Sequence, residues 1–252
     1  MRRFYNTYAK NKKLSQLVKE IGWGHNIVIF EKVQDEKIKQ FYLKMTINND
    51  WSRHILEEKI KNNEYQNYLN QQTNFEKTVN KSLLGKLACE VKDQYNFDFL
   101  ELEKPLQERT LEQGLVDNIV KFLAEMGGDF CFVGRQFRVA INDKEFFIDL
   151  LFYHRGLECL VAVELKADEF LPAHAGQMQF YLTALNKEVK KPNENPSVGI
   201  IICKKRDKTI VEYALESTTH PVGVATFKHK ELPKKISKYL PSEEEIKKRL
   251  VG

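Results

Sequence analysis

The chain has 252 residues, of which 42% are hydrophobic and 30% are charged, and its formal net charge at pH 7 is +5. This composition is typical of globular proteins and excludes a wholly disordered or collagen-like chain. The length suits two domains, and no segment reaches the roughly 18 uninterrupted apolar residues of a membrane helix. The N-terminus lacks the apolar segment of a secretory signal. We therefore expect a cytoplasmic protein with no membrane partner.

The positive charge is concentrated near the N-terminus. Residues 1–61 contain 13 Lys and Arg against 7 Asp and Glu, whereas residues 111–252 contain 21 against 20. A basic segment beside a neutral one suits a nucleic-acid partner, and a solvated helix face would carry the same excess. Charge alone leaves both interpretations open.

Apolar residues recur at helical spacing through the first third of the chain. The pattern predicts a helix that includes residues 36–45, and Ser52 is the expected cap of a helix that runs to about Lys61. Eight of the thirteen residues 62–74 are Asn or Gln, which indicates a polar connection or a frayed helix. We expect residues 1–104 to form an all-α domain.

The pattern changes over residues 105–252, where we expect an α/β domain. An apolar stripe predicts an amphipathic helix over residues 111–126. The elements expected after it are three strands, a helix and two further strands, at residues 130–141, 145–153, 159–166, 173–187, 197–203 and 222–227. The predicted order is α-β-β-β-α-β with a last short strand, which is a hairpin meander flanked by helices.

Three charged residues stand in otherwise apolar strands. Asp149 lies within the second strand, and Glu164 and Lys166 end the third. Glu164 and Lys166 point to one face because strand side chains alternate, and a hairpin between the two strands would bring Asp149 close to Glu164.

Two neighbouring carboxylates repel each other. A Mg²⁺ ion (or Mn²⁺) held by Asp149, Glu164, the carbonyl of Leu165 and several waters would remove this repulsion. Lys166 would then stabilise charge that develops on a phosphate. A structural Glu–Lys pair at a strand end is the alternative, and we favour the catalytic interpretation.

The helix predicted over residues 111–126 offers two further acids, Glu112 and Glu125. Glu112 lies within about 20–30° of the centre of the apolar stripe, and Glu125 lies more than roughly 90° away. Glu112 is therefore the favoured inward acid. Arg135 and Gln136 lie in the first strand, where a phosphate contact and a buried structural pairing fit Arg135 equally well.

Longer motifs resemble known proteins. Asp149, fourteen intervening residues and Glu164-Leu165-Lys166 are similar to the signature of PD-(D/E)XK nucleases, whose core has the same order of elements. Further strings resemble the YhcG family of bacterial nucleases over nearly the whole chain. These strings include Trp51-Ser-Arg53, Thr73-Asn-Phe75, Phe132-Val-Gly-Arg-Gln136, Ile148-Asp-Leu-Leu-Phe-Tyr-His154 and Gly176-Gln-Met-Gln-Phe-Tyr-Leu182.

The resemblance implies a PD-(D/E)XK nuclease domain over residues 105–252 and a helical, DNA-binding domain over residues 1–104. It implies a Mg²⁺-dependent endonuclease, a hydrolase of DNA phosphodiester bonds. Gln177 and Tyr181 would lie along the DNA backbone, with ordinary packing of Tyr181 as the alternative. Family members usually carry further N-terminal helices, so we expect the chain to begin late in that module.

Two other functions are compatible with the same residues. One is a non-catalytic nucleic-acid-binding or recruitment protein on a nuclease fold, and the other is an RNA-directed nuclease with the same metal chemistry. The intact set of Asp149, Glu164 and Lys166 favours the enzyme. We also expect a homodimer, only because homodimers are common among proteins with such folds.

Overall fold

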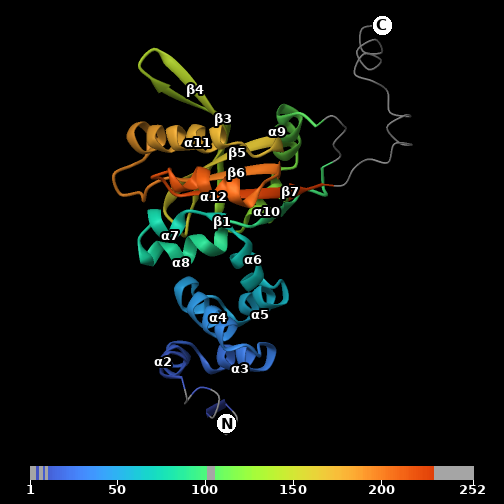
Figure 1. The fold of residues 1–252 in the computed structure, drawn as a ribbon, viewed down its shortest axis with the longest axis vertical. Helices are drawn as coiled ribbons and strands as arrows, with labels where there is room; N and C mark the ends of the chain where they lie inside the picture. The colour runs from blue at the N-terminus through green and yellow to red at the C-terminus, as the bar shows by residue number, and fades with distance from the viewer. Residues whose placement is uncertain (1–3, 6–7, 9–10, 101–105, 230–252) are drawn as a thin grey trace, which may run out of the picture.

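The computed structural model describes residues 4–5, 8, 11–100 and 106–229. Figure 1 shows a sheet covered by helices, with a smaller group of helices, drawn in blue, extending from one end of the molecule. The smaller group comes from the N-terminal part of the chain. The predicted domain boundary between residues 104 and 105 lies outside the described residues and stays a prediction.

The N-terminal group is helical, as the residue pattern predicts. Its helices are α2 (Lys12–Glu20), α3 (Trp23–Lys32), α4 (Glu36–Asn49), α5 (Arg53–Lys61) and α6 (Glu64–Asn70). Asp35 caps α4 by accepting hydrogen bonds from two amides of its first turn. The hydroxyl of Ser52 caps α5 by accepting from the amide of Ile55 at 3.3 Å. These contacts satisfy amides that a helix start leaves without partners, and the predictions of α4 and α5 are confirmed.

The N-terminal helices bury an apolar core of their own. Ile29, Leu43 and Leu56 are fully buried in it. The segment rich in Asn and Gln that follows α5 forms α6.

A seven-stranded sheet forms the rest of the fold. Its strand order is β1-β7-β6-β5-β4-β3, and β2 also pairs with β7. The strands are β1 (Gln72–Thr73), β2 (Gln94–Asn96), β3 (Phe130–Ile141), β4 (Lys144–His154), β5 (Cys159–Glu169), β6 (Val198–Lys205) and β7 (Val222–Lys228). β3, β4 and β5 pair in antiparallel fashion, and β5, β6 and β7 pair in parallel.

Helices cover both faces of this sheet. They are α7 (Phe75–Thr78), α8 (Lys81–Glu90), α9 (Glu108–Asp117), α10 (Ile119–Met126), α11 (Pro172–Ala184), its π-helical extension η1 (Leu185–Val189) and α12 (Lys208–Glu216). Leu115 of α9 and Phe122 of α10 are buried against one face, and Met178 and Leu182 of α11 are buried against the other. The predicted order α-β-β-β-α-β with a last short strand is confirmed.

Two helix predictions are corrected. The single helix predicted over residues 111–126 begins at Glu108 and is divided at Asn118, whose side-chain amide donates to the carbonyl of Gly114 at 3.1 Å. Such a bond between an Asn side chain and the backbone competes with helix continuation. Helix α12 was not predicted, and Asp207 caps it.

Strands β1 and β2 depart from the expectation of a purely helical N-terminal region. Both pair with β7, and Phe75, Tyr95 and Phe97 are buried in the core beside α9 and α10. Segments of two or three residues are too short to show the two-residue periodicity of a strand. Residues that precede the predicted boundary therefore belong to the sheet and its core.

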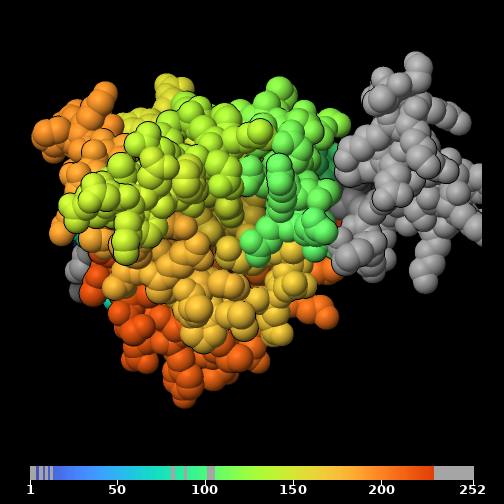
Figure 2. All heavy atoms as spheres, turned by 90° about the horizontal axis from the view of Figure 1, so that it is seen from above, coloured from blue at the N-terminus to red at the C-terminus, as the bar shows by residue number. Residues whose placement is uncertain are grey.

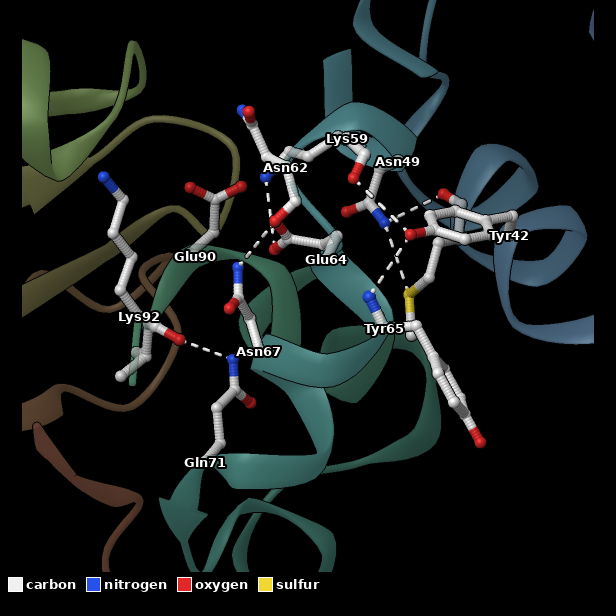
Figure 3. Close-up of polar contacts among 12 residues, drawn as sticks. Tyr42, Asn49, Lys59, Asn62, Glu64, Tyr65, Asn67, Gln71, Glu90 and Lys92 are labelled. Atoms are coloured by element: carbon white, nitrogen blue, oxygen red, sulfur yellow. Dashed lines mark hydrogen bonds and ion pairs between the residues drawn. The ribbon is translucent and has the colours of Figure 1, made fainter. Parts of the chain in front are cut away.

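A cleft of about 1230 Å³ lies between α4–α6 and the region around α8 and α10. Figure 3 shows Lys59, Glu64, Gln71 and Lys92 among its polar residues. Lys59 pairs with Glu64 at 3.4 Å, and Lys92 pairs with Glu125 at 2.9 Å. The predicted metal and catalytic residues do not line this cleft. The two regions are joined by other polar contacts, in which the side-chain amides of Asn49 and Gln71 donate to the carbonyls of Gly85 and Val91.

Candidate active site

Asp149 and Glu164 come together where β4 and β5 begin to pair. The register pairs Leu150 with Val163, so Asp149 and Glu164 stand one step further along. The amide of Asp149 donates to Glu164 Oε1 at 3.3 Å, and the amide of Leu165 donates to Asp149 Oδ2 at 2.9 Å. Each of the two carboxylates therefore accepts a hydrogen bond from a backbone amide of the opposite strand, which holds Asp149 and Glu164 next to each other. The Leu165 carbonyl as a metal ligand stays a prediction.

Lys166 lies on the same strand face as Glu164. Its Nζ is 3.3 Å from Glu164 Oε2 and 3.6 Å from Glu108 Oε2, and the residue is 9% exposed. Burial alone would lower the pKa of Lys166, but the charges of Glu164, Glu108 and Asp149 outweigh it and raise the pKa. The ammonium is therefore held charged at this strand end.

Glu164 is strongly perturbed by its surroundings. The residue is 2% exposed, and burial, followed by the charge of Asp149, raises its pKa to about 8, although Lys166 acts in the opposite direction. A carboxyl group with such a pKa holds its proton at neutral pH unless a cation takes the place of that proton.

A local irregularity in β4 shapes the site. Ile148 and Leu151 both belong to the core cluster that contains α11, although three positions separate them. In a regular strand these two side chains would point to opposite faces of the sheet, so the alternation of side chains is broken beside Asp149. Opposite this break, Gln136 has a φ of 42°, a conformation that is uncommon for residues other than glycine.

Gln136 links Asp149 to α9. Its side-chain amide donates to Asp149 Oδ1 at 3.1 Å and also to Glu112 Oε2. Burial, followed by the charge of Asp149, raises the pKa of Glu112, while the bond from Gln136 opposes this. The structure thus links Glu112 to Asp149 through Gln136. Glu125 lies elsewhere, bonded to Lys92 and to the amide of Asn96 at 3.0 Å.

The remaining predicted residues lie on the elements around this cluster. Gln177 donates to the hydroxyl of Tyr181 at 2.9 Å on α11, and Glu164 and Asp149 are close enough to act on the pKa of Tyr181, which is raised mainly by burial. Arg135 donates to Gln113 of α9. Figure 2 shows that α9, the β3–β4 pair and α11, coloured from green to gold, share one face of the molecule.

Glu108 and Gln113 lie in this region and were not among the predicted site residues. The helix was expected to begin at residue 111, so Glu108 lay outside every predicted element, although it reaches Lys166. Gln113 contacts Arg135 from the exposed side of α9. This contact forms because α9 lies beside β3 in the folded protein, and the residue pattern does not predict that arrangement.

The donor set has the chemistry of a site for a hard divalent cation. Among the described residues, no three His, Cys, Asp or Glu side chains form a complete metal-binding group. Asp149 and Glu164 supply two carboxylates side by side, and Mg²⁺ binds through one or two carboxylates while it keeps several waters. The residues present therefore fit Mg²⁺ or Mn²⁺ and do not distinguish between them.

The strand order, with Asp149 facing Glu164 and Lys166 at a strand end, places the protein in the class of PD-(D/E)XK nuclease folds. Residues 88–243 match the YhcG PDDEXK nuclease domain, and residues 1–67 match the DUF1016 N-terminal domain. The chain belongs to the YhcG family.

A curated relative and two solved structures show similarity to the chain. The relative, "Putative nuclease YhcG" of Escherichia coli (strain K12), is 33% identical over 201 residues, which cover 78% of this chain and 53% of the relative. The chain thus spans about half the length of this relative. A repair endonuclease from Pyrococcus abyssi has a TM-score of 0.35, 17% identity, and coverage of 52% of this chain and 50% of its own. The EndoMS-dsDNA2 complex has a TM-score of 0.36, 19% identity, and coverage of 53% and 48%.

Within residues 11–100 and 106–229, no helix combines the length and the apolar character needed to cross a bilayer.

Proposed function

We propose that the chain is a metal-dependent endonuclease that hydrolyses phosphodiester bonds in DNA. The observation that supports this most directly is the contact of Lys166 with Glu164 at 3.3 Å, beside Asp149. Membership of the YhcG family and the match to its nuclease domain support the same conclusion.

Asp149 and Glu164 hold the cation in this proposal, Mg²⁺ or Mn²⁺, with Leu165 contributing its carbonyl. When bound, the cation supplies Lewis-acid stabilisation of the phosphate and lowers the pKa of water. Glu164 releases the proton that its raised pKa otherwise retains. Asp149 is kept in position by the Leu165 amide and by Gln136.

Lys166 places its ammonium where negative charge grows on the phosphoryl oxygens. Glu108 and Glu164 hold this group in position before the substrate arrives, so little reorganisation accompanies the reaction. Glu112, held through Gln136, is the third acid of the site in this proposal. Gln177 and Tyr181 contact the backbone of the nucleic acid from α11, and Arg135 and Gln136 do so from β3.

The N-terminal helices supply non-specific phosphate affinity in this proposal. Residues 1–61 carry 13 Lys and Arg against 7 Asp and Glu, and such binding weakens steeply with salt. Figure 1 places these helices at the opposite end of the molecule from the β3–β4 hairpin, so one duplex that touches both would extend along the molecule. A cytoplasmic location and a homodimer, which would allow both strands to be cut, belong to the same proposal.

Plasmid nicking tests this function. We expect the wild type to nick supercoiled DNA with Mg²⁺, we expect EDTA to abolish nicking, and we expect Lys166→Ala to slow it by at least about a hundredfold. Lys92→Ala is the matched control, since Lys92 also pairs with a glutamate, at 2.9 Å, but lies in the cleft beside α10. Loss of nicking in both variants would mean that Lys166 has no special role.

The competing functions give different results in the same assay. A binding or recruitment protein would retain the plasmid in a gel shift and would leave it intact with Mg²⁺ or Mn²⁺. An RNA-directed nuclease would cut RNA of the same sequence and spare the DNA. Either result would contradict the proposed DNA endonuclease.

A further inference from the structure

The β3–β4 pair continues beyond the sheet as a two-stranded ribbon. β4 pairs with β5 only from Leu150 to His154, whereas it pairs with β3 along its whole length from Lys144. The ribbon, residues 136–149, therefore leaves the sheet at the candidate catalytic acid. Figure 1 shows it projecting past α11.

One face of the ribbon is anchored to the domain. Val139 and Ile148 are buried in the core cluster that contains α11. The ring of Phe146 lies 4.6 Å from that of Phe180, measured between centroids, at an angle of 60°. A free two-stranded hairpin is marginally stable in water, so this packing fixes the ribbon relative to the site.

The opposite face of the ribbon is uncovered. Arg138 and Phe147 stand directly opposite each other in the register, followed by Ala140 and Glu145, and paired residues of this kind share one face. All four are exposed, and Phe147 retains 44% of its accessible surface. Glu145, the acid on this face, pairs with Arg138 at 2.9 Å. The two charges of this face therefore neutralise each other, and Phe147 and Ala140 supply its uncharged surface.

We propose that this outer face lies in the major groove of double-stranded DNA next to the bond that is cut. This inference rests on the proposed function, which holds the scissile phosphodiester at Asp149, where the ribbon leaves the sheet. From Asp149 to Asn142, at the turn, the ribbon is roughly 24 Å long, which is about two thirds of a helical turn of DNA.

The dimensions favour duplex DNA over other nucleic acids. The major groove of B-DNA is about 12 Å wide and admits a two-stranded ribbon, whereas the corresponding groove of duplex RNA is too narrow and deep for side chains. Arg138 presents a guanidinium to phosphates or guanine edges. Phe147 presents apolar surface to thymine methyl groups.

Two variants remove this face and leave its anchoring intact. Arg138→Ser combined with Glu145→Ser deletes the ion pair without changing net charge, and Phe147→Ser deletes the exposed ring. Tyr213→Ser is the matched control, since Tyr213 is 72% exposed on α12. Circular dichroism melting verifies that each variant is folded.

The measurements are fluorescence anisotropy in EDTA and hydrolysis of a small phosphodiester. Anisotropy uses a 30-base-pair DNA duplex, its single strand and the RNA duplex of the same sequence. We expect both variants to lose at least about tenfold affinity for duplex DNA, with changes under threefold for the other two ligands. The p-nitrophenyl ester of thymidine 5′-monophosphate should be hydrolysed with Mg²⁺ within twofold of the wild-type rate.

Other outcomes would either overturn the inference or show that the proposed function fails independently of it. Wild-type duplex affinity in both variants would overturn it, as would an equal loss for single-stranded DNA or for duplex RNA. If the wild type hydrolyses no phosphodiester while the variants still lose duplex affinity, the proposed function fails and the ribbon assignment stands. A salt dependence that is reduced by about one in logarithmic slope in the Arg138 variant would identify a phosphate contact.

Discussion

Replacing Glu164 by Gln should stabilise the protein in the absence of metal. The pKa of Glu164 is raised from 4.5 to about 8, mainly by burial and by Asp149. At ~1.4 kcal/mol per pH unit, this difference corresponds to at most ~5 kcal/mol of unfavourable free energy for the ionised group. Gln keeps an oxygen to accept the Asp149 amide, and Lys166 keeps Glu108 at 3.6 Å. We expect a net gain of ~1–3 kcal/mol, because local relaxation already relieves part of the repulsion.

The gain should depend on pH in one direction. Below about pH 4.5 the Glu164 carboxyl is protonated in the folded and the unfolded chain, so it does not affect the free energy of unfolding. Between pH 4.5 and about 8 the unfolded chain releases this proton and the folded chain retains it, so the free energy of unfolding of the wild type falls as the pH rises. The advantage of Glu164→Gln should therefore appear above pH 4.5 and be complete above pH 8.

Differential scanning calorimetry in EDTA at pH 5, 7 and 9 measures this effect. At pH 9 the variant should melt roughly 2–10 °C above the wild type, and the two should converge at pH 5. Glu125→Gln is the control, because Glu125 pairs with Lys92 at 2.9 Å away from the site and its loss should not remove the pH dependence. A variant less stable than the wild type at pH 9 would refute the view that the ionised Glu164 carboxylate destabilises the fold in the absence of a cation.

Two further predictions concern metal binding and backbone strain. Asp149→Asn should keep the fold, since the amide oxygen can still accept from Leu165, and should lower Mg²⁺ affinity by at least about tenfold in titration calorimetry; wild-type affinity would contradict the site. Gln136→Gly should be more stable than Gln136→Ala by ~1 kcal/mol in urea unfolding, because only Gly adopts the φ of 42° at position 136 without strain. The reverse order would mean that no strain is stored there.

The sequence was most informative where long segments have a strong period. The three adjacent strands, the hairpin between β4 and β5 and the contact of Asp149 with Glu164 all follow from apolar runs and the alternation of side chains. Helix α4 and the Ser52 cap of α5 follow from equally local signals. These features depend on residues that are close in the chain, so the pattern contains them.

Features that depend on distant pairing were not predictable in the same way. β1 and β2 form because β7 offers an edge more than a hundred residues away. Gln136, whose amide contacts Glu112 and Asp149, has a positive φ opposite the break in the alternation of β4, and the residue pattern of the strand predicts neither feature. Glu112 was favoured over Glu125 from helix geometry alone, and its role in catalysis stays a prediction.

Single-turnover cleavage of duplex DNA at saturating protein tests the central claim most directly. The wild type should cut with Mg²⁺ and not with EDTA, and Lys166→Ala should retain DNA and metal binding while cleavage slows by about 10²–10³, which is typical for the loss of one preorganised charge contact. Lys166→Arg should restore little, because a planar guanidinium does not replace a compact ammonium beside Glu164. Equal cleavage by the wild type and Lys166→Ala would place the activity elsewhere, and no metal-dependent cleavage by the wild type would contradict the assignment as a nuclease.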